Sequence, residues 1–150
     1  MEARNLFERF DMEVNVEGLK SDLSNVGTED RYREVPVGNT YNVKVDKLQL
    51  VESRNGKPMV SCWFKIIEGP FKNSVLFMNQ VVNTGYGLHM ANEFLRSLES
   101  QVEIKFENFK QYHNMILDIH EAVDNLEYSV EYGEKKGFKT FKITEVYEGF

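Results

Sequence analysis

The chain has 150 residues, a net charge of −6 and a single cysteine, Cys62. This length favours one domain with a substantial core, and the lone cysteine excludes an intramolecular disulfide. No apolar run approaches the roughly 18 residues of a membrane span, and the N-terminal sequence MEARNLFERF has no signal-peptide core, so the sequence fits a protein of a reducing cytoplasm.

Positive charge is concentrated in one part of the chain. Residues 38–85 carry six basic and three acidic side chains, whereas residues 1–37 carry five basic and nine acidic ones. Such segregation creates a local field that the net charge hides. The alternative interpretation is a solvated face with scattered lysines.

Residues 1–37 are expected to form an N-terminal arm and linker ahead of a domain over residues 38–150. The arm carries three large apolar side chains close together, Leu6, Phe7 and Phe10, and the segment 24–34 that follows is polar. Large apolar groups outside a core usually dock on another surface, which can be the domain of their own chain, a sister subunit or another protein. We expect these three to dock on a second subunit and give a homo-oligomer, with a dimer favoured.

The next 45 residues are predicted to form three antiparallel strands. Residues 40–51 alternate in apolar character, with a slip at Asp46–Lys47 that a β-bulge would absorb. Residues 53–57 (SRNGK) contain Asn-Gly, the strongest short hairpin signal. The second strand, 58–67, places Val60, Cys62, Phe64 and Ile66 on a core face, with Trp63 and Lys65 opposite, and a third strand ends at Val82.

The pattern then changes to two helices and a closing hairpin. Residues 86–98 show a helical stripe of Tyr86, Met90, Phe94 and Leu98. Residues 106–123 show a second stripe of Phe109, Tyr112, Ile116 and Ile119. Strands are predicted at 128–132 and 138–147, joined by a turn at 134–137 (EKKG).

Three strands, two helices and two strands follow the order of the OB-fold, a five-stranded, partly open barrel with a helical connection between strands three and four. The sequence therefore predicts a mainly β, α+β fold of this type. In that fold, strands two and three and the first and last hairpin loops carry the nucleic-acid face.

Several runs of the sequence resemble a known family: FERFDMEVNVEGLK, VPVGNTYNVKVDKLQLVES, GKPMVSCWFKIIEGPFKNSVLFMNQVV, GYGLHMANEFLRSL and EYGEKKGFKTFKITEV. They are similar to small bacteriophage proteins from replication and recombination gene clusters, a family long carried as a domain of unknown function. The resemblance implies single-stranded DNA binding in the cytoplasm of a bacterial host, and partners among replication or recombination proteins.

The strand pattern supplies the candidate contacts. Trp63, Phe77 and Phe138 lie opposite the core faces or beside a basic loop, so stacking on bases and packing in a second small core both remain open. Bases that stack on aromatic rings gain roughly 1–3 kcal/mol each. The candidate phosphate contacts are Lys44, Lys47, Arg54, Lys57, Lys65, Lys72, Lys135, Lys136, Lys139 and Lys142.

The sequence offers little for catalysis, a metal or a cofactor. His89, His113 and His120 lack metal-ligand spacing, and one cysteine cannot build a structural zinc site. No phosphate-binding loop or dinucleotide fingerprint is present. We therefore expect a non-catalytic binding protein without a cofactor that protects single-stranded DNA with little sequence preference. The alternative is a protein–protein module that recruits or inhibits a host or phage enzyme.

Overall fold

The computed structural model describes residues 35–148, and these form one compact unit. The arm residues Leu6, Phe7 and Phe10 lie outside the described residues. Five antiparallel strands form one sheet: β1 (Asn39–Glu52), β2 (Pro58–Ile66), β3 (Val75–Val81), β4 (Leu126–Lys135) and β5 (Phe138–Glu148). Two helices, α3 (Gly85–Ser97) and α4 (Phe109–Ala122), connect β3 to β4. The predicted order of elements is confirmed.

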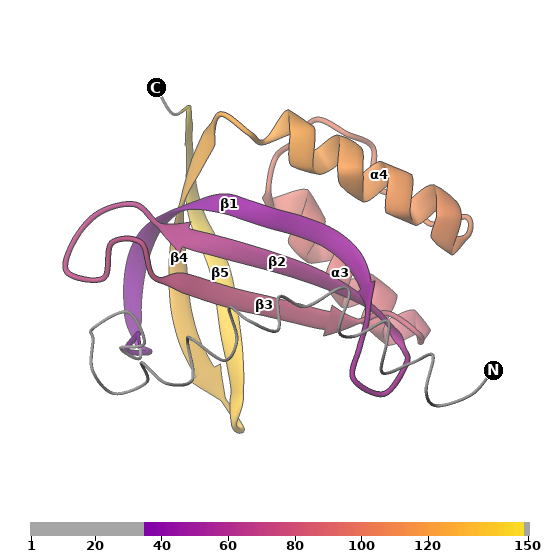
Figure 1. Ribbon diagram of the computed structural model, residues 1–150, viewed down its shortest axis with the longest axis horizontal. Helices are drawn as coiled ribbons and strands as arrows, with labels where there is room; N and C mark the ends of the chain where they lie inside the picture. The colour runs from indigo at the N-terminus through magenta and orange to yellow at the C-terminus, as the bar shows by residue number, and fades with distance from the viewer. Residues whose placement is uncertain (1–34, 149–150) are drawn as a thin grey trace, which may run out of the picture. The chain divides into compact units, whose positions relative to one another are not determined.

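The long strand β1 joins the two halves of the sheet, whose order is β3-β2-β1-β4-β5. Its first residues, from Asn39 to Val43, pair with β4, and from Val43 onward it pairs with β2. Figure 1 shows β1, β2 and β3 running across the view, β4 and β5 running steeply behind them, and both helices at the right. Because β1 changes partner along its length, the two halves lie at a marked angle to each other.

The sheet has two edges rather than a closed circumference. β3 and β5 approach each other, but no hydrogen-bonded ladder joins them within residues 35–148. The five strands and two helices confirm the mainly β, α+β class. Because the sheet is open between β3 and β5, a barrel remains a prediction.

A bulge in β1 keeps its apolar residues on the core side. Val45 pairs with Phe64 and Lys47 pairs with Trp63, so Asp46 is the extra residue. The bulge restores the alternation, and Leu48 is buried just as Val45 is. The predicted slip at Asp46–Lys47 is confirmed.

The core lies between the inner face of the sheet and the two helices. Phe64 occupies its centre, with ring contacts to Phe94, Tyr128 and Phe141. The strand residues predicted to face inward from β2 are all fully buried: Val60, Cys62, Phe64 and Ile66. The helices and their C-cap residues contribute Ala91, Leu95, Leu98, Tyr112, Met115, Ile116, Ile119 and Val123.

Both helices begin at a polar cap. The Thr84 hydroxyl accepts a hydrogen bond from the Gly87 N–H at 3.0 Å, and the Asn108 side chain accepts one from the Gln111 N–H at 2.8 Å. At Gly87 a Cβ would lie 2.2 Å from the Val81 carbonyl oxygen, so only glycine permits this close approach of α3 to the end of β3.

Three predicted details differ from the structure. The Asn108 cap starts the second helix at Phe109 rather than at residue 106, which leaves Phe109 40% exposed instead of in the core. On α3 the buried stripe begins at Gly87, so Tyr86 and Met90 are exposed. The strands of the last hairpin extend further than predicted, and its turn is Lys136–Gly137 alone.

Candidate nucleic-acid interface

The outer face of β1, β2 and β3 carries a row of three side chains from three adjacent strands. Trp63 on β2 is the direct partner of Lys47 on β1 and of Phe77 on β3. The Lys47 Nζ lies 4.2 Å from the Trp63 ring centroid, and the Trp63 and Phe77 centroids are 5.1 Å apart in an edge-on arrangement. A cation, a half-buried indole and an exposed phenyl ring therefore form one continuous row.

This row is distinct from the core. Trp63 is half-buried and Phe77 is 52% exposed, whereas the side chains on the opposite face of β2 are fully buried. Ring faces and edges that solvent reaches are available to a planar ligand. A tryptophan with a cation on one side and an aromatic neighbour on the other can stack with a base while the cation meets a phosphate.

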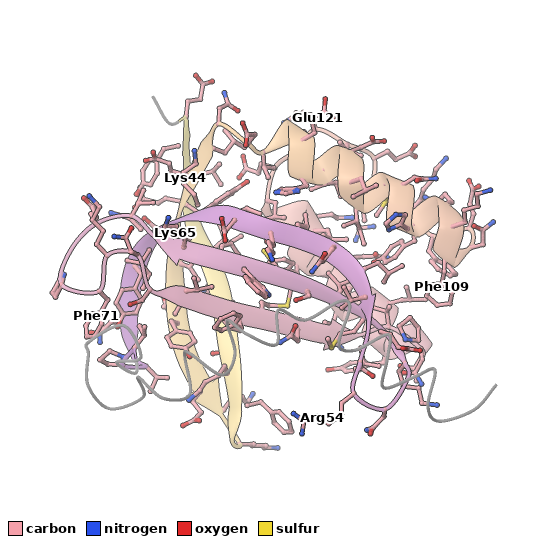
Figure 2. All side chains as sticks on the ribbon, in the orientation of Figure 1. Lys44, Arg54, Lys65, Phe71, Phe109 and Glu121 are labelled. Atoms are coloured by element: carbon pink, nitrogen blue, oxygen red, sulfur yellow. The ribbon has the colours of Figure 1, made fainter. Side chains whose placement is uncertain are left out.

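A second row, one step along the same face, brings two lysines together. Lys44 and Lys65 are direct partners across β1 and β2, and Figure 2 places them at the same end of the strand pair. Like charges directly opposite in a sheet cost up to about 1 kcal/mol. Within residues 35–148, neither lysine makes an ion pair that would offset this cost.

Lys72 reaches the same region from the loop between β2 and β3. That loop is held by Phe71, whose ring packs edge-on against Tyr41 with centroids 6.1 Å apart, and by the Asn73 N–H, which donates to the Ile66 carbonyl at 2.8 Å. Lys44, Lys65 and Lys72 all line one depression of about 390 Å³. Three cations from three segments therefore meet beside the aromatic row.

The remaining candidates lie on the two hairpins. Arg54 and Lys57 are exposed on the loop that joins β1 to β2, which the Ser53 and Gly56 backbone bond closes at 2.9 Å. Figure 2 shows Arg54 far along the sheet from Lys65, and Figure 1 shows the tips of both hairpins at the bottom of the view. The β1–β2 loop is thus a separate basic site at the other end of the face.

The β4–β5 hairpin combines exposed lysines with an exposed ring. Lys136 and Gly137 both have positive φ, as the two central residues of a type I′ turn require, and Phe138 next to them is 76% exposed. Lys135 and Lys136 are exposed as well. The other two cations of this hairpin have acidic neighbours.

Lys139 pairs with Glu134 at 3.0 Å, and Lys142 faces Glu131 across β4 and β5. These two lysines are therefore weaker phosphate candidates than those on β1 and β2, because an anion already lies beside each of them.

The structure also shows an apolar groove that sequence reasoning missed. It has a volume of about 530 Å³ and lies between the β1–β2 hairpin, the start of α3 and the start of α4. Phe106 and Phe109 form one wall, with ring centroids 5.0 Å apart. Asn108 is the residue that could have indicated this groove from the sequence. As the N-cap of α4, it places Phe106 before the helix and Phe109 at the first helical residue.

The groups that could support catalysis are scattered. Cys62 is fully buried, and this burial raises the pKa of its thiol, so it is not a nucleophile within reach of a substrate. Within residues 35–148, no three histidine, cysteine or carboxylate side chains gather to hold a metal ion. No helix in this part of the chain is long and apolar enough to cross a membrane.

Comparison with known families gives a match that covers most of the described domain and part of the segment before it. Residues 19–142 match a family described as "Protein of unknown function (DUF669)". The chain belongs to this family. The match includes every candidate nucleic-acid contact, from Lys44 to Lys142, and excludes Leu6, Phe7 and Phe10. No curated protein matches the chain significantly.

Proposed function

We propose that this member of the DUF669 family binds single-stranded DNA without catalysis and protects it during bacteriophage replication or recombination. The observation that carries the proposal is the row formed by Lys47, Trp63 and Phe77 on the outer face of the sheet. Proteins that bind single strands without sequence preference combine a cationic groove along the backbone with aromatic rings for the bases. This face has both components side by side.

The topology supports the same function. We infer that the sheet is an open variant of the OB-fold, because its strand order, its shared first strand and its helices between β3 and β4 match that fold. OB-folds bind oligonucleotides on the face of strands two and three, between the first and last hairpins. The two rings of the row lie on β2 and β3, and both hairpins carry exposed lysines.

The affinity would be mainly electrostatic. If about four phosphates are neutralised, the logarithm of the association constant falls with the logarithm of salt concentration at a slope of about −3, since each phosphate contributes about −0.7 on a single strand. Lys47 lies over the Trp63 ring, and Lys44, Lys65 and Lys72 line one depression. None of these four lysines forms an ion pair in the described part of the chain.

The test is fluorescence anisotropy with labelled oligo-dT and with duplex DNA of the same length, over a series of salt concentrations. The proposal expects tighter binding to the single strand and the salt slope given above. Lys110→Gln is the control, because Lys110 is an exposed lysine of α4 that lines neither the depression nor the apolar groove and forms no ion pair with another described residue, and it should leave the slope unchanged. Equal affinity for duplex, or salt-independent binding, would contradict the proposal.

One observation favours a second function. The groove walled by Phe106 and Phe109 is apolar, and exposed apolar surface of this kind often marks a protein interface. A protein–protein module would use this groove instead of the cationic face. In that case Phe109→Ala would abolish binding to a partner, and oligo-dT would not bind at all.

A further inference from the structure

The depression beside the aromatic row has charges of both signs on its walls. Lys44, Lys65 and Lys72 line it together with Asp46 and Asp124. A site for phosphate alone has no use for carboxylates, because a carboxylate repels an anion. The two aspartates therefore need an explanation that the lysines do not supply.

Each aspartate is brought to the depression by a defined backbone feature. Asp46 is the extra residue of the β1 bulge, and bulges commonly redirect a side chain near a functional site. Asp124 follows the last turn of α4, where its N–H donates to the Glu121 carbonyl at 3.4 Å. The β1 bulge and the end of α4 thus each place one aspartate at the wall of the same depression.

The opposite charges do not neutralise each other by contact. Within residues 35–148, none of these lysines or aspartates forms an ion pair at 4.0 Å or less. A ligand with both an anionic group and hydrogen-bond donors would bind the lysines through the anion and the aspartates through the donors. A nucleotide with an amino-bearing base is such a ligand, since its phosphate suits lysine and its exocyclic amine suits a carboxylate.

The volume fits this ligand class. About 390 Å³ lies in the range of small-molecule sites, roughly 300–1,000 Å³, whereas a lone phosphate would leave most of the space empty. The position also fits a strand that crosses the sheet. Lys65 is two residues from Trp63 on the same face, a separation of about 7 Å along the strand.

We propose that this depression holds one nucleotide of the bound strand, with its phosphate on Lys44, Lys65 and Lys72 and its base edge toward Asp46 and Asp124. The site favours cytosine or adenine, whose amino groups donate, over thymine, which presents a carbonyl there. This inference rests on the proposed function. It adds a modest base preference at one position to binding that is otherwise independent of sequence.

The experiment compares the affinities of (dC)12 and (dT)12 for the wild type, Asp124→Asn, Asp46→Asn and Glu121→Gln. Glu121 is the matched control: it is an exposed carboxylate of α4, three residues before Asp124, and it does not line the depression. Glu121→Gln should strengthen binding to both oligomers slightly and equally, because it removes only a negative charge. Each aspartate variant should leave (dT)12 affinity equal or slightly higher and lower (dC)12 affinity, so that the ratio changes about fivefold or more against (dC)12.

The outcomes separate the two hypotheses. If Asp124→Asn and Asp46→Asn strengthen binding to both oligomers equally, as Glu121→Gln does, the depression holds phosphate only and the inference is wrong, although the proposed function stands. If the wild type binds neither oligomer, the proposed function itself fails. Melting curves of both aspartate variants establish that a change in the ratio comes from a folded protein.

Discussion

The Nζ atom of Lys47 lies over the indole of Trp63, 4.2 Å from the ring centroid, and the two residues are direct partners across β1 and β2. A cation over an aromatic ring at the protein surface gains about 0.5–1 kcal/mol. The pairing depends on the bulge at Asp46, because regular alternation from Val45 without a bulge would point Lys47 toward the core and Leu48 toward solvent. One backbone irregularity thus builds both the core and the candidate site.

Truncation of the aromatic row should weaken DNA binding more than it weakens the fold. Trp63→Ala and Phe77→Ala are each expected to lower the affinity for oligo-dT by roughly 1–3 kcal/mol. The melting temperature should fall by only a few degrees, because neither ring belongs to the buried core. Tyr86→Ala removes an aromatic ring that is 73% exposed on α3 and makes no ring contact with Trp63 or Phe77, and it should leave the affinity unchanged. A large loss of stability with unchanged affinity would show that Trp63 serves packing.

Replacement of Lys65 should have opposite effects on stability and on binding. Lys65→Thr removes a like-charge contact with Lys44 and adds a residue that favours strands, so the melting temperature should rise by about one to three degrees. Oligo-dT affinity should fall at the same time. Lys142→Thr is the control, because Lys142 faces Glu131 and its removal should not raise the melting temperature. Stabilisation without a loss of affinity would place Lys65 outside the binding site.

Alkaline solution should unfold the protein through its buried tyrosines. Burial raises the pKa of Tyr112 from 10.0 to about 12, and its hydroxyl donates to the Asn92 side chain at 2.6 Å. Because the folded pKa lies above the unfolded one, this contribution is complete below pH about 10 and is lost as the pH rises toward 12. Denaturant melts at pH 9 to 12 measure the loss, and Tyr112→Phe should reduce its slope. A flat stability profile over this range would contradict the prediction.

Burial also raises the pKa of Tyr128, whose hydroxyl donates to the Leu98 carbonyl at 2.7 Å, and that of Cys62. Deprotonation of Tyr128 and of Cys62 therefore also lowers the stability of the fold at alkaline pH. Tyr112→Phe should reduce this loss of stability without removing it.

Deletion of the N-terminal arm tests the assembly hypothesis. Leu6, Phe7 and Phe10 precede a domain whose core begins at Val35, and removal of residues 1–30 retains every residue of that domain. We expect a folded protein whose oligomeric state, measured by light scattering, is lower than that of the full chain. Its affinity for oligo-dT should also be weaker, because linked sites lose their avidity. Leu6→Ser, Phe7→Ser and Phe10→Ser together should reproduce the effect. An unchanged number of subunits in both variants would contradict the hypothesis.

Periodicity in the sequence predicted most of the fold because the core is built from clean alternation. Val60, Cys62, Phe64 and Ile66 face inward as their spacing of two predicts, and the slip at Asp46 marked a real bulge. The burial of side chains at the helix ends was less predictable. Phe109 is apolar and in phase with Tyr112, but its place at the start of α4, beside the groove, leaves it partly in solvent.

The candidate site was only partly predictable. Strand alternation put Trp63 and Lys65 on the outer face, but the partners of Trp63 depend on register, which a one-residue bulge changes. The depression that joins Lys44 to Asp124 brings together residues eighty positions apart, and no local pattern records such a contact. The sequence thus indicated that one face of the sheet carries aromatic and basic side chains. Which of these side chains lie next to each other is determined by the tertiary structure.

Tryptophan fluorescence tests the central claim most directly, because Trp63 is the only tryptophan in the chain. Titration of the full-length protein with (dT)12 should quench this fluorescence in a saturable manner, and added salt should reverse the quenching as the strand dissociates. Duplex DNA of the same length should quench much less. An emission spectrum that (dT)12 leaves unchanged, at low salt and at saturating concentration, would contradict the placement of single-stranded DNA on this face.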